Sequence, residues 1–553
     1  MTPVDVFPIF GSRRVLTLMQ INRPALACSS IAGMADDVLV AEARVRVSAL
    51  RAQLEELEGE AVRLLETHVS WVLLARRLAY KIKKPVRLPF LDFTSLAERR
   101  RCCDEELRVN RRFAPDLYLD VVEIRQGAAG PCLDGPGEAV DVAVRMRRFA
   151  DGALWSERLA AGTLGPAQID SFARALAAAH RAAAAPPADG AFGSPAVHSS
   201  IADGLVAAID AWQSGPAPLP EWPPLRVWLR AEVARLDRHW RDRLGAGAVR
   251  DCHGDLHLAN VVQQGGQAFA FDALEFAAEL RWIDPLDDLA FLVMDLLAND
   301  RRDLGFRLLD AYLAESGDFD GIPALRFFLV SRALVRAQVG TLRNAEGEGE
   351  GNEAALRYLR LASALAFGHD PRLAITFGLP GSGKTFASQS LIETVGAVRV
   401  RSDIERKRLF GVAPLQSSRD HGADGIYAAE AGELTYAHLL AVARKVLLAG
   451  WPIVVDAAFL RRAERNRFAD LAASLAVPFA ILHCHADTAL LRQRIEARRK
   501  RGDDASEADI DVLERLSRVV ERLDDAELAS TIDCDAGAPR APADLARRWT
   551  ARR

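Results

Sequence analysis

Short apolar runs alternate with helix-length amphipathic segments from residue 371 to the end of the chain. Leu373–Phe377 is the first run, and its apolar, β-branched composition predicts a buried strand. Three further runs predict strands at 397–401, 451–456 and 479–484. Because helical segments separate the runs, this half predicts an α/β fold around a parallel sheet.

The pattern before residue 371 is mixed rather than regularly alternating. Two short apolar runs predict a β-hairpin, and a charged helix follows them. Later segments with apolar residues at helical spacing predict a mostly helical part, so this half predicts an α+β fold. The predicted elements are a solvated helix at 36–66, strands at 66–74 and 78–83, and helices at 96–113, 167–183 and 223–244.

Length and linkers divide the 553-residue chain into two functional domains. Gly368-His369-Asp370-Pro371 separates a predicted helix from the next strand, so we place the boundary between residues 368 and 369. The first domain spans 36–368, with a small lobe at about 60–125 and a helical lobe at about 140–368. The second domain spans 369–553. The Glu-Gly run at 345–351 predicts a flexible loop inside the first domain.

The first 35 residues do not resemble the rest of the chain. Ser12-Arg13-Arg14 and Ala25-Leu26-Ala27-Cys28 resemble export-signal features, but the apolar stretch between them is too short for a signal peptide. We therefore interpret 1–35 as a disordered leader or as a mis-assigned start, with Met34 as an alternative first residue.

The composition of the chain limits which kinds of partner and which compartment we expect for the protein. A net charge of −4 gives no support for a nucleic-acid or anionic-membrane partner. Seven cysteines without C-x-x-C spacing indicate reduced thiols, which favours a cytoplasmic protein. No apolar run approaches the ~18 residues of a membrane span.

The strongest motif is the segment G-L-P-G-S-G-K-T between a predicted strand and a predicted helix. This is the context of a phosphate-binding loop, in which glycines let backbone N–H groups turn onto phosphate oxygens. Lys384 is expected to reach the β/γ-phosphates of ATP, and Thr385 to bind Mg²⁺. The predicted nucleotide-binding residues are Gly378, Leu379, Pro380, Gly381, Ser382, Gly383, Lys384 and Thr385.

Two aspartates follow later strands of the same half. Asp403 comes after the second predicted strand, and Asp456 ends the third as in a Walker B strand. Ligands of parallel sheets gather at the carboxyl ends of the strands. Asp456 is therefore a predicted metal ligand beside the phosphate-binding loop.

A second motif occurs in the first half. His253-Gly254-Asp255 with Asn260 has the spacing H-x-D-x-x-x-x-N of a kinase catalytic loop. Asp255 is placed to accept a hydroxyl proton, and Asn260 to bind Mg²⁺. Asp272 ends a short predicted strand at 267–272, where kinases carry another metal-binding aspartate.

These residues resemble the aminoglycoside phosphotransferase superfamily of small-molecule kinases, which has a protein-kinase-like fold. The resemblance covers 66–368 and includes Asp284-Pro285 and Asp288-Leu289-Ala290. It implies Asp255 as the catalytic base, Asn260 and Asp272 as Mg²⁺ ligands, and Asp288 as a structural brace.

The same resemblance implies that Lys81 grips the nucleotide phosphates and that Glu106 is its ion-pair partner, with Glu105 as an alternative. Two features depart from the family. No Gly-rich loop precedes Lys81, and the nearby Lys83 and Lys84 leave the identity of the lysine open.

Residues 371–553 resemble P-loop kinases related to polynucleotide kinase and zeta toxins. The resemblance implies that Asp403 accepts the proton of an attacking hydroxyl and that Arg406 holds a substrate anion. It also implies that Arg494 and Arg498, four apart on one helix face, neutralise the transferred phosphate. A solvated basic helix is the alternative for these arginines. His483 and His485 flank Cys484 on a predicted strand, and we interpret this trio as core rather than metal-binding, because adjacent strand residues point to opposite faces.

Together the motifs predict a cytoplasmic, ATP- and Mg²⁺-dependent phosphotransferase with two nucleotide sites, acting on small-molecule hydroxyls. Two alternatives remain open. The first domain could be a binding module coupled to a P-loop ATPase switch, or the second could be a nucleic-acid end kinase, which the acidic balance disfavours. The oligomeric state is not predicted.

Overall fold

The computed structural model describes residues 30–88, 91–128, 130–187, 190–213, 219–345, 351–414, 416, 429–501, 506–538 and 540–552. The predicted leader at 1–35 therefore lies almost wholly outside the described residues, as does most of the predicted loop at 345–351. Within the described ranges, no helix is both long and apolar enough to span a membrane.

The chain forms two compact units, and the chain passes between them three times. The first unit comprises Met1–Ala298 and Phe327–Ala366, and the second comprises Asn299–Arg326 and Phe367–Arg553. The last passage, between residues 366 and 367, falls two residues before the predicted boundary. The earlier segment 299–326 corrects the prediction that 36–368 is one continuous domain.

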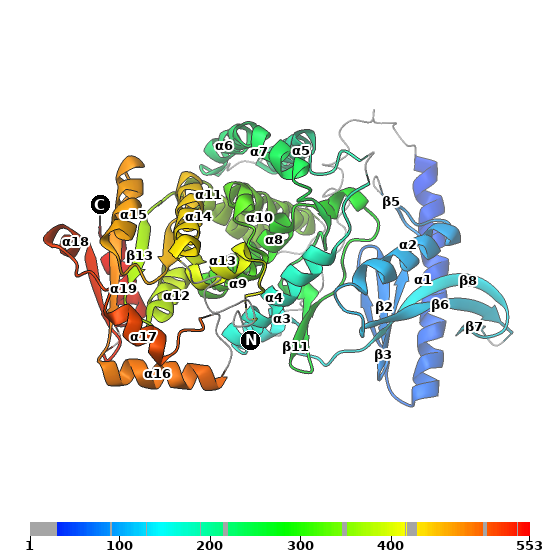
Figure 1. Cartoon of the computed structure of the whole chain (residues 1–553). Helices are drawn as coiled ribbons and strands as arrows, with labels where there is room; N and C mark the ends of the chain where they lie inside the picture. Colours follow the sequence, from blue (N-terminus) through cyan, green and yellow to red (C-terminus); the bar gives the residue numbers. More distant parts are fainter. Residues whose placement is uncertain are drawn as a thin grey trace. The chain divides into compact units, whose positions relative to one another are not determined.

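The first unit begins with a long helix and a six-stranded antiparallel sheet (Figure 1). Ala43, Val47 and Leu50 of helix α1 (Ser30–Glu58) pack with Trp71 and Ile82 of the sheet in one apolar cluster. Helix α2 (Leu96–Asn110) contacts strands β6 and β8 of the same sheet. The strand order is β1-β2-β3-β8-β6-β7, for β1 (Arg63–Glu66), β2 (Ser70–Leu74), β3 (Leu78–Lys83), β6 (Tyr118–Gly127), β7 (Gly130–Leu133) and β8 (Glu138–Arg147).

The predicted single strand at 66–74 is two strands joined by a tight turn. Thr67 makes the turn, since its Oγ1 accepts a hydrogen bond from the Ser70 amide at 2.9 Å and its own amide donates to the Ser70 carbonyl. The predicted hairpin of β2 and β3 across residues 75–77 is confirmed, with Val72 opposite Lys81.

The rest of the first unit is mainly helical. Helix α8 is buried on all sides, which explains its almost uniformly apolar sequence. Two short antiparallel pairs lie before it in the chain and carry the predicted catalytic loop. The helices are α3 (Trp155–Ala160), α4 (Pro166–Ala182), α5 (Pro195–Gln213), α6 (Trp222–Arg235), α7 (Asp237–Gly245), α8 (Pro285–Ala298), α10 (Ile322–Ala345) and α11 (Gly351–Phe367), and the pairs are β9 (Arg250–Asp251) with β12 (Trp282–Ile283) and β10 (Val261–Gln264) with β11 (Gln267–Ala270).

The second unit is built on a five-stranded parallel sheet. Four strands are those that the sequence predicts, and the fifth, β17, was missed because its residues Thr-Ile-Asp-Cys-Asp are too polar to look like a core strand. The order is β14-β15-β13-β16-β17, for β13 (Leu373–Phe377), β14 (Val398–Arg401), β15 (Ile453–Asp456), β16 (Phe479–His485) and β17 (Thr531–Asp535).

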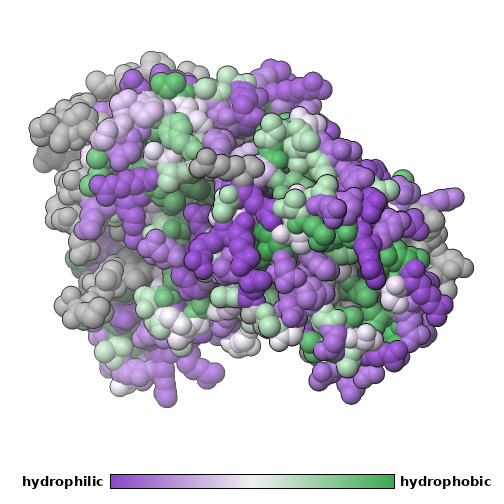
Figure 2. Space-filling model, turned by 90° about the vertical axis from the view of Figure 1, so that its left-hand side faces the viewer, coloured by the Kyte–Doolittle hydropathy of each residue, from purple (hydrophilic) through white to green (hydrophobic). Residues whose placement is uncertain are grey.

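Helices surround this sheet. Helices α12 and α19 pack on one face, where Leu391, Leu545 and Trp549 join sheet residues in an apolar cluster. The helices are α9 (Arg302–Ser316), α12 (Lys384–Val395), α13 (Ser402–Leu409), α14 (Ala429–Leu448), α15 (Arg462–Ser474), α16 (Thr488–Arg501), α17 (Ile510–Ser517), α18 (Asp525–Ala529) and α19 (Pro542–Thr550). On the face drawn in Figure 2, hydrophilic residues are interspersed with smaller hydrophobic areas, as is usual for protein surfaces.

Helix α9 explains why segment 299–326 clusters with the second unit. It packs against α12 and β14, and a Cβ on Gly396, which ends α12, would lie 2.7 Å from the Phe306 ring. Asp310 of α9 forms a buried ion pair with Arg399 of β14, with Oδ2 2.6 Å from Nη2. The carboxylate that neutralises Arg399 therefore comes from 89 residues earlier in the chain.

We expect Asp310→Ala to destabilise the second unit by about 3–5 kcal/mol, because it leaves the Arg399 charge buried without its carboxylate. The measurement is denaturant unfolding followed by far-UV circular dichroism. Asp303→Ala is the matched control on the same helix, since the side chains of the Asp303–Arg301 pair are 44% and 31% exposed and the pair should contribute at most ~1 kcal/mol. Equal unfolding midpoints for the two variants would contradict the role of this pair.

Candidate functional site

The predicted catalytic loop is held in place by Asp288 at the start of α8. Its carboxylate accepts hydrogen bonds from the backbone amides of His253 at 3.0 Å and Gly254 at 2.8 Å, and from His180 Nε2 at 3.1 Å. Burial opposes the charge on Asp288, but these donors and the nearby imidazoles outweigh it and lower its pKa to about 2. This geometry matches the bracing role that the resemblance implies.

Gly254 is required by the shape of the same loop. Its φ is +85°, and a Cβ at this position would lie 2.8 Å from the Leu280 carbonyl oxygen. A larger residue would meet both backbone strain and a backbone contact, so the loop can pass this point only with glycine.

Asp255 and Asn260 lie side by side in the loop. Asn260 Nδ2 donates to the Asp255 backbone oxygen at 2.9 Å and to Asp255 Oδ2 at 3.2 Å. His257 Nε2 lies 3.5 Å from the same Oδ2. Burial alone would raise the pKa of Asp255, but its interactions with His257, His253 and Arg336 lower it, so the carboxylate is ionised at neutral pH. An ionised carboxylate can accept a proton.

The segment around Asp272 follows β11 and is hydrogen bonded to this loop. The Phe271 amide donates to the Asn260 carbonyl at 3.0 Å, and His253 Nε2 lies 2.8 Å from the Phe271 carbonyl. Asp272 itself has a φ of +65°, and its amide donates to Tyr118 Oη at 3.0 Å. Residues other than glycine rarely adopt a left-handed backbone conformation, and those that do are often found at functional sites. The buried Tyr118 helps to hold Asp272 in this conformation.

Two lysines of β3 share three buried carboxylates. Lys81 Nζ lies 2.8 Å from Glu106 Oε1 and 2.6 Å from Asp272 Oδ1. Lys83 Nζ lies 2.7 Å from Glu106 Oε2 and also pairs with Glu275. We name these five residues the carboxylate–lysine cluster. Their side chains are all at most 8% exposed.

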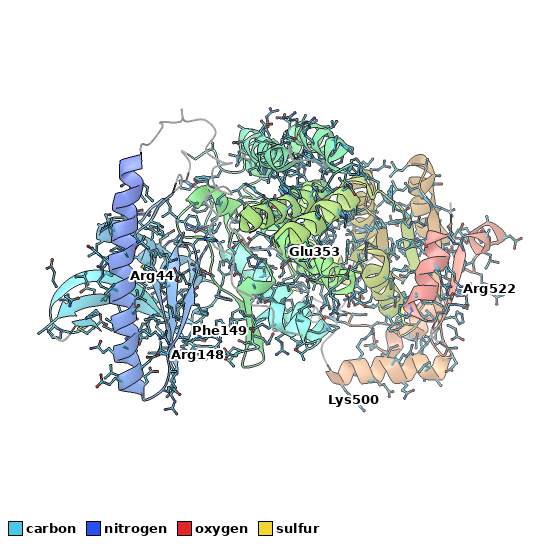
Figure 3. The ribbon with its side chains drawn as sticks, turned by 180° about the vertical axis from the view of Figure 1, so that it is seen from behind. Arg44, Arg148, Phe149, Glu353, Lys500 and Arg522 are labelled. Carbon is cyan, nitrogen blue, oxygen red and sulfur yellow. The ribbon has the colours of Figure 1, made fainter. Side chains whose placement is uncertain are left out.

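Of the alternatives that the sequence left open, Glu105 and Lys84 fall outside the cluster, whereas Lys83 belongs to it. Glu105 instead pairs with Arg108 and Arg281, each at 2.7 Å. Lys84 pairs with Glu66 at 2.7 Å, and Glu66 also accepts a bond from Arg44 of α1 (Figure 3). The geometry therefore favours Lys81 and Glu106. Sequence analysis named Lys83 as a possible alternative to Lys81 but missed Glu275, for which the only signal was the spacing Asp-x-x-Glu from residue 272.

The carboxylate–lysine cluster has one more acid than base. Burial raises the pKa of Asp272 to about 7, with Glu106 and Glu275 adding to the effect against Lys81. The two lysines instead lower the pKa of Glu106 to about 2, against its burial. Asp272 is therefore the acid of the cluster whose ionised form is least favoured, and a cation bound beside it would stabilise that ionised form.

Asn260 and Asp272 fit a magnesium ion chemically. Both offer oxygen ligands, which Mg²⁺ prefers. Asn260 is completely buried, and its Oδ1 has no hydrogen-bond partner in the described part of the chain. Because a buried amide oxygen rarely lacks a partner, this atom supports a ligand position.

The phosphate-binding loop of the second unit joins β13 to α12. Gly378, Gly381 and Gly383 have φ values of +154°, +82° and +89°, which other residues rarely adopt. Lys384 Nζ donates to the carbonyls of Gly378 at 3.0 Å and Leu379 at 2.9 Å. Burial lowers the pKa of Lys384, against the pull of Asp456 and other acids.

A cavity of about 1330 Å³ opens at this loop. The predicted residues of the second unit meet in it, apart from Gly378 and Leu379, which contact Lys384 through their carbonyls. Sequence reasoning missed several other polar side chains there, because they come from separate elements that only the folded chain brings together. The predicted lining residues are Pro380, Gly381, Ser382, Gly383, Lys384, Thr385, Asp403, Arg406, Asp456, Arg494 and Arg498, and the missed ones include Arg401, Tyr436, Arg461, Arg515 and Arg540.

Asp456, at the end of β15, and helix α16 both lie beside the phosphate-binding loop. Asp456 Oδ2 lies 3.3 Å from Ser388 Oγ on α12. Arg494 Nη1 donates to the Gly381 carbonyl at 3.4 Å, and Arg498 Nη2 donates to the Ala508 carbonyl at 2.9 Å. Leu491 and Ile495 of α16 pack with Leu513. Helix α16 is thus anchored on one face, which disfavours the alternative of a fully solvated basic helix.

The second unit matches a known family. Residues 373–523 match the family model described as an AAA domain. With the parallel sheet and the phosphate-binding loop, this confirms the predicted P-loop NTPase fold. The antiparallel sheet, the Lys81–Glu106 pair and the braced catalytic loop give the first unit a protein-kinase-like fold, as predicted.

Similar proteins span most of the chain. Proteins of Mycobacterium tuberculosis and Mycobacterium bovis, each described as uncharacterized, are 29% identical over 453 residues, which cover 80% of this chain and 87% of theirs. A choline/ethanolamine kinase family protein from Mesorhizobium loti is 14% identical, with a TM-score of 0.37, and covers 58% of this chain and 95% of its own. A gluconokinase from Sinorhizobium meliloti is 19% identical, with a TM-score of 0.22, and covers 33% and 91%.

We expect Asp288→Asn to destabilise the first unit by about 2–4 kcal/mol, because it removes a buried charge that accepts three hydrogen bonds. The lowered pKa of Asp288 sets the pH dependence. Its stabilisation is complete above the ordinary pKa of 3.8 and is lost as the pH falls through about 2. Denaturant unfolding at neutral pH and at successively lower pH measures both effects.

The exposed Glu279 supplies the control, and Glu279→Gln should leave the unfolding midpoint unchanged. A difference between wild type and Asp288→Asn that persists at pH 2 would show that the charge of Asp288 is not the cause.

Proposed function

We propose that both units are ATP- and Mg²⁺-dependent kinases that phosphorylate hydroxyl groups of small molecules. The observation that carries the proposal is the arrangement of Asp255, Asn260 and Asp272 on hydrogen-bonded segments, with Lys81 and Glu106 paired beside Asp272. Kinases use residues of these types, in this order along the chain, to hold ATP and to accept the hydroxyl proton.

In the first unit, Asp255 accepts the proton of the substrate hydroxyl, and the Asn260 amide keeps its carboxylate in position. Lys81, oriented by Glu106, holds the phosphate oxygens of ATP. Asn260 and Asp272 would hold Mg²⁺, which neutralises charge on the phosphates when bound. The excess negative charge of the carboxylate–lysine cluster favours such a cation.

In the second unit, the phosphate-binding loop and Lys384 hold the phosphates of a second ATP. Thr385 and Asp456 would hold its Mg²⁺. Asp403 accepts the proton of the acceptor hydroxyl, Arg406 holds an anionic group of that acceptor, and Arg494 and Arg498 stabilise charge on the transferred phosphate.

The volume of the cavity at the phosphate-binding loop of the second unit supports a small acceptor. At about 1330 Å³ it exceeds the ~300–1,000 Å³ of typical small-ligand pockets and leaves space for an acceptor beside a nucleotide. A small-molecule partner, rather than a nucleic acid or a membrane, is thus part of the proposal, and so is the cytoplasm, where ATP is available. The two alternatives, a first domain that is a binding module coupled to a P-loop ATPase switch and a second domain that is a nucleic-acid end kinase, become outcomes of the tests below.

We expect titration calorimetry with Mg²⁺ and a non-hydrolysable ATP analogue to find two sites per chain, and Lys384→Ala to leave one. Lys384 is placed to hold phosphate, so its loss should remove the second site only. Lys500→Ala on α16 is the control, because Lys500 is exposed (Figure 3). If the wild type had one nucleotide site and Lys384→Ala had none, the result would instead favour a first unit that binds something other than nucleotide.

We expect Asp255→Asn to lower phosphoryl transfer by the first unit about 10²–10⁴-fold while leaving its nucleotide affinity nearly unchanged. The assay is phosphate transfer to a panel of hydroxyl metabolites in the Lys384→Ala background, where the second site is silent. Unchanged turnover would overturn the assignment of Asp255 as the base. Transfer to oligonucleotide ends by the intact second unit would favour the end-kinase alternative.

A further inference from the structure

Strands β16 and β17 bring two histidines and an aspartate together on one face of the second sheet. His483 and His485 are two residues apart on β16, so they share a face, and Cys484 between them points to the other. The parallel register places Asp533 of β17 opposite His483. The interpretation of the trio as core considered adjacent residues only, and β17 was not predicted.

The three side chains offer ligand atoms at close range. His485 Nε2 lies 2.7 Å from Asp533 Oδ1, and the two imidazole rings are 4.9 Å apart between centroids. One ligand atom from each of the three residues lies within 4.8 Å of the other two. In a tetrahedral zinc site with bonds near 2.0–2.1 Å, ligand atoms are about 3.3 Å apart. Side-chain rotations that move the ligand atoms by ~1 Å would therefore bring all three within bonding distance of one ion.

The surroundings suit a metal ion that keeps an open coordination position. The side chains of His485 and Asp533 are 41% and 52% exposed, so an ion can enter from solvent. The His483 ring packs on Phe377 at 5.0 Å between centroids, which limits its rotation. Arg540 lies at the rim, with Nη2 3.8 Å from Asp533 Oδ2.

We propose that His483, His485 and Asp533 form a binding site for a divalent transition-metal ion of the zinc type. Two imidazoles and one carboxylate select such an ion over Mg²⁺, which prefers oxygen ligands and water. Three protein ligands leave a fourth position for water. The site is independent of the proposed kinase activities, because none of its residues belongs to either proposed catalytic set.

The ion would join the edge strand β17 to β16 through side chains as well as backbone. Phe377, which contacts His483, directly precedes Gly378 of the phosphate-binding loop. Metal binding would therefore stabilise the part of the sheet that carries this loop, and the melting temperature should rise with the concentration of the ion.

Two other groups in the described chain could be mistaken for this site. His180, Cys252 and Asp288 also lie close together, but they are fully buried and Asp288 is occupied by the catalytic loop. Cys484 and Cys534 are register partners on the opposite face of the same strands. Thiolates bind zinc strongly, so the test must separate them from the histidines.

The test is titration of the full-length protein with Zn²⁺ in excess Mg²⁺ by calorimetry, and with Co²⁺ by visible absorption. We expect one site per chain, at least a tenfold loss of affinity in His485→Ala and in Asp533→Asn, and a rise in melting temperature with Zn²⁺ that occurs in the wild type but not in these two variants. Both side chains are partly exposed, so these variants should fold, and Asp533→Asn keeps the size of the side chain.

Two control variants should bind Zn²⁺ as the wild type does. They are His438→Ala, whose histidine pairs with Glu405 at 2.9 Å elsewhere in the second unit, and Cys484→Ser. The proposal is overturned if His485→Ala and Asp533→Asn retain wild-type affinity, if the wild type binds no Zn²⁺, or if Cys484→Ser abolishes binding.

Discussion

Three buried carboxylates share two buried ammonium groups in the first unit, and the proposed active site depends on this imbalance. Glu106 is held between Lys81 and Lys83, which fixes α2 against β3. Burial and the neighbouring carboxylates raise the pKa of Asp272 to about 7, so its ionised form lacks full compensation. Removing charges from water is costly, so such a cluster is stable only where every group has a close partner. A divalent cation at Asp272 would complete the compensation that the lysines begin.

The proposed catalytic loop is positioned by backbone hydrogen bonds rather than by the ion pairs of the cluster. Asp288 binds two successive backbone amides and so fixes the path of the chain at His253 and Gly254 rather than any side chain. Asp255 and Asn260 then follow on a backbone that is already fixed, and their mutual hydrogen bond orients the carboxylate. The ion pairs of the cluster and the backbone hydrogen bonds of Asp288 therefore position different parts of one proposed site.

Much of both sites could be predicted from sequence because their motifs are local. The phosphate-binding loop is eight consecutive residues between a strand and a helix, and the residues from His253 to Asn260 form one turn and a short 3₁₀ segment. Predictions were incomplete where a residue or strand pairs with a partner that is far away in the sequence. Glu105 and Glu106 are neighbours on one helix, and only their partners, Arg281 and Lys81, distinguish them. Strand β17 is recognisable mainly by its pairing with β16, almost 50 residues earlier.

Helix α9 also constrains how the protein can fold during synthesis. Its buried residues, Phe306 among them, leave the ribosome well before α12, against which they pack, has been made. At roughly 5–20 residues per second the delay is on the order of ten seconds. The first unit likewise waits for residues 327–366. Neither unit can close as the chain emerges in order, so the apolar face of helix α9 stays exposed on the nascent chain. We expect chaperones that bind such faces to retain this protein until its last third is translated.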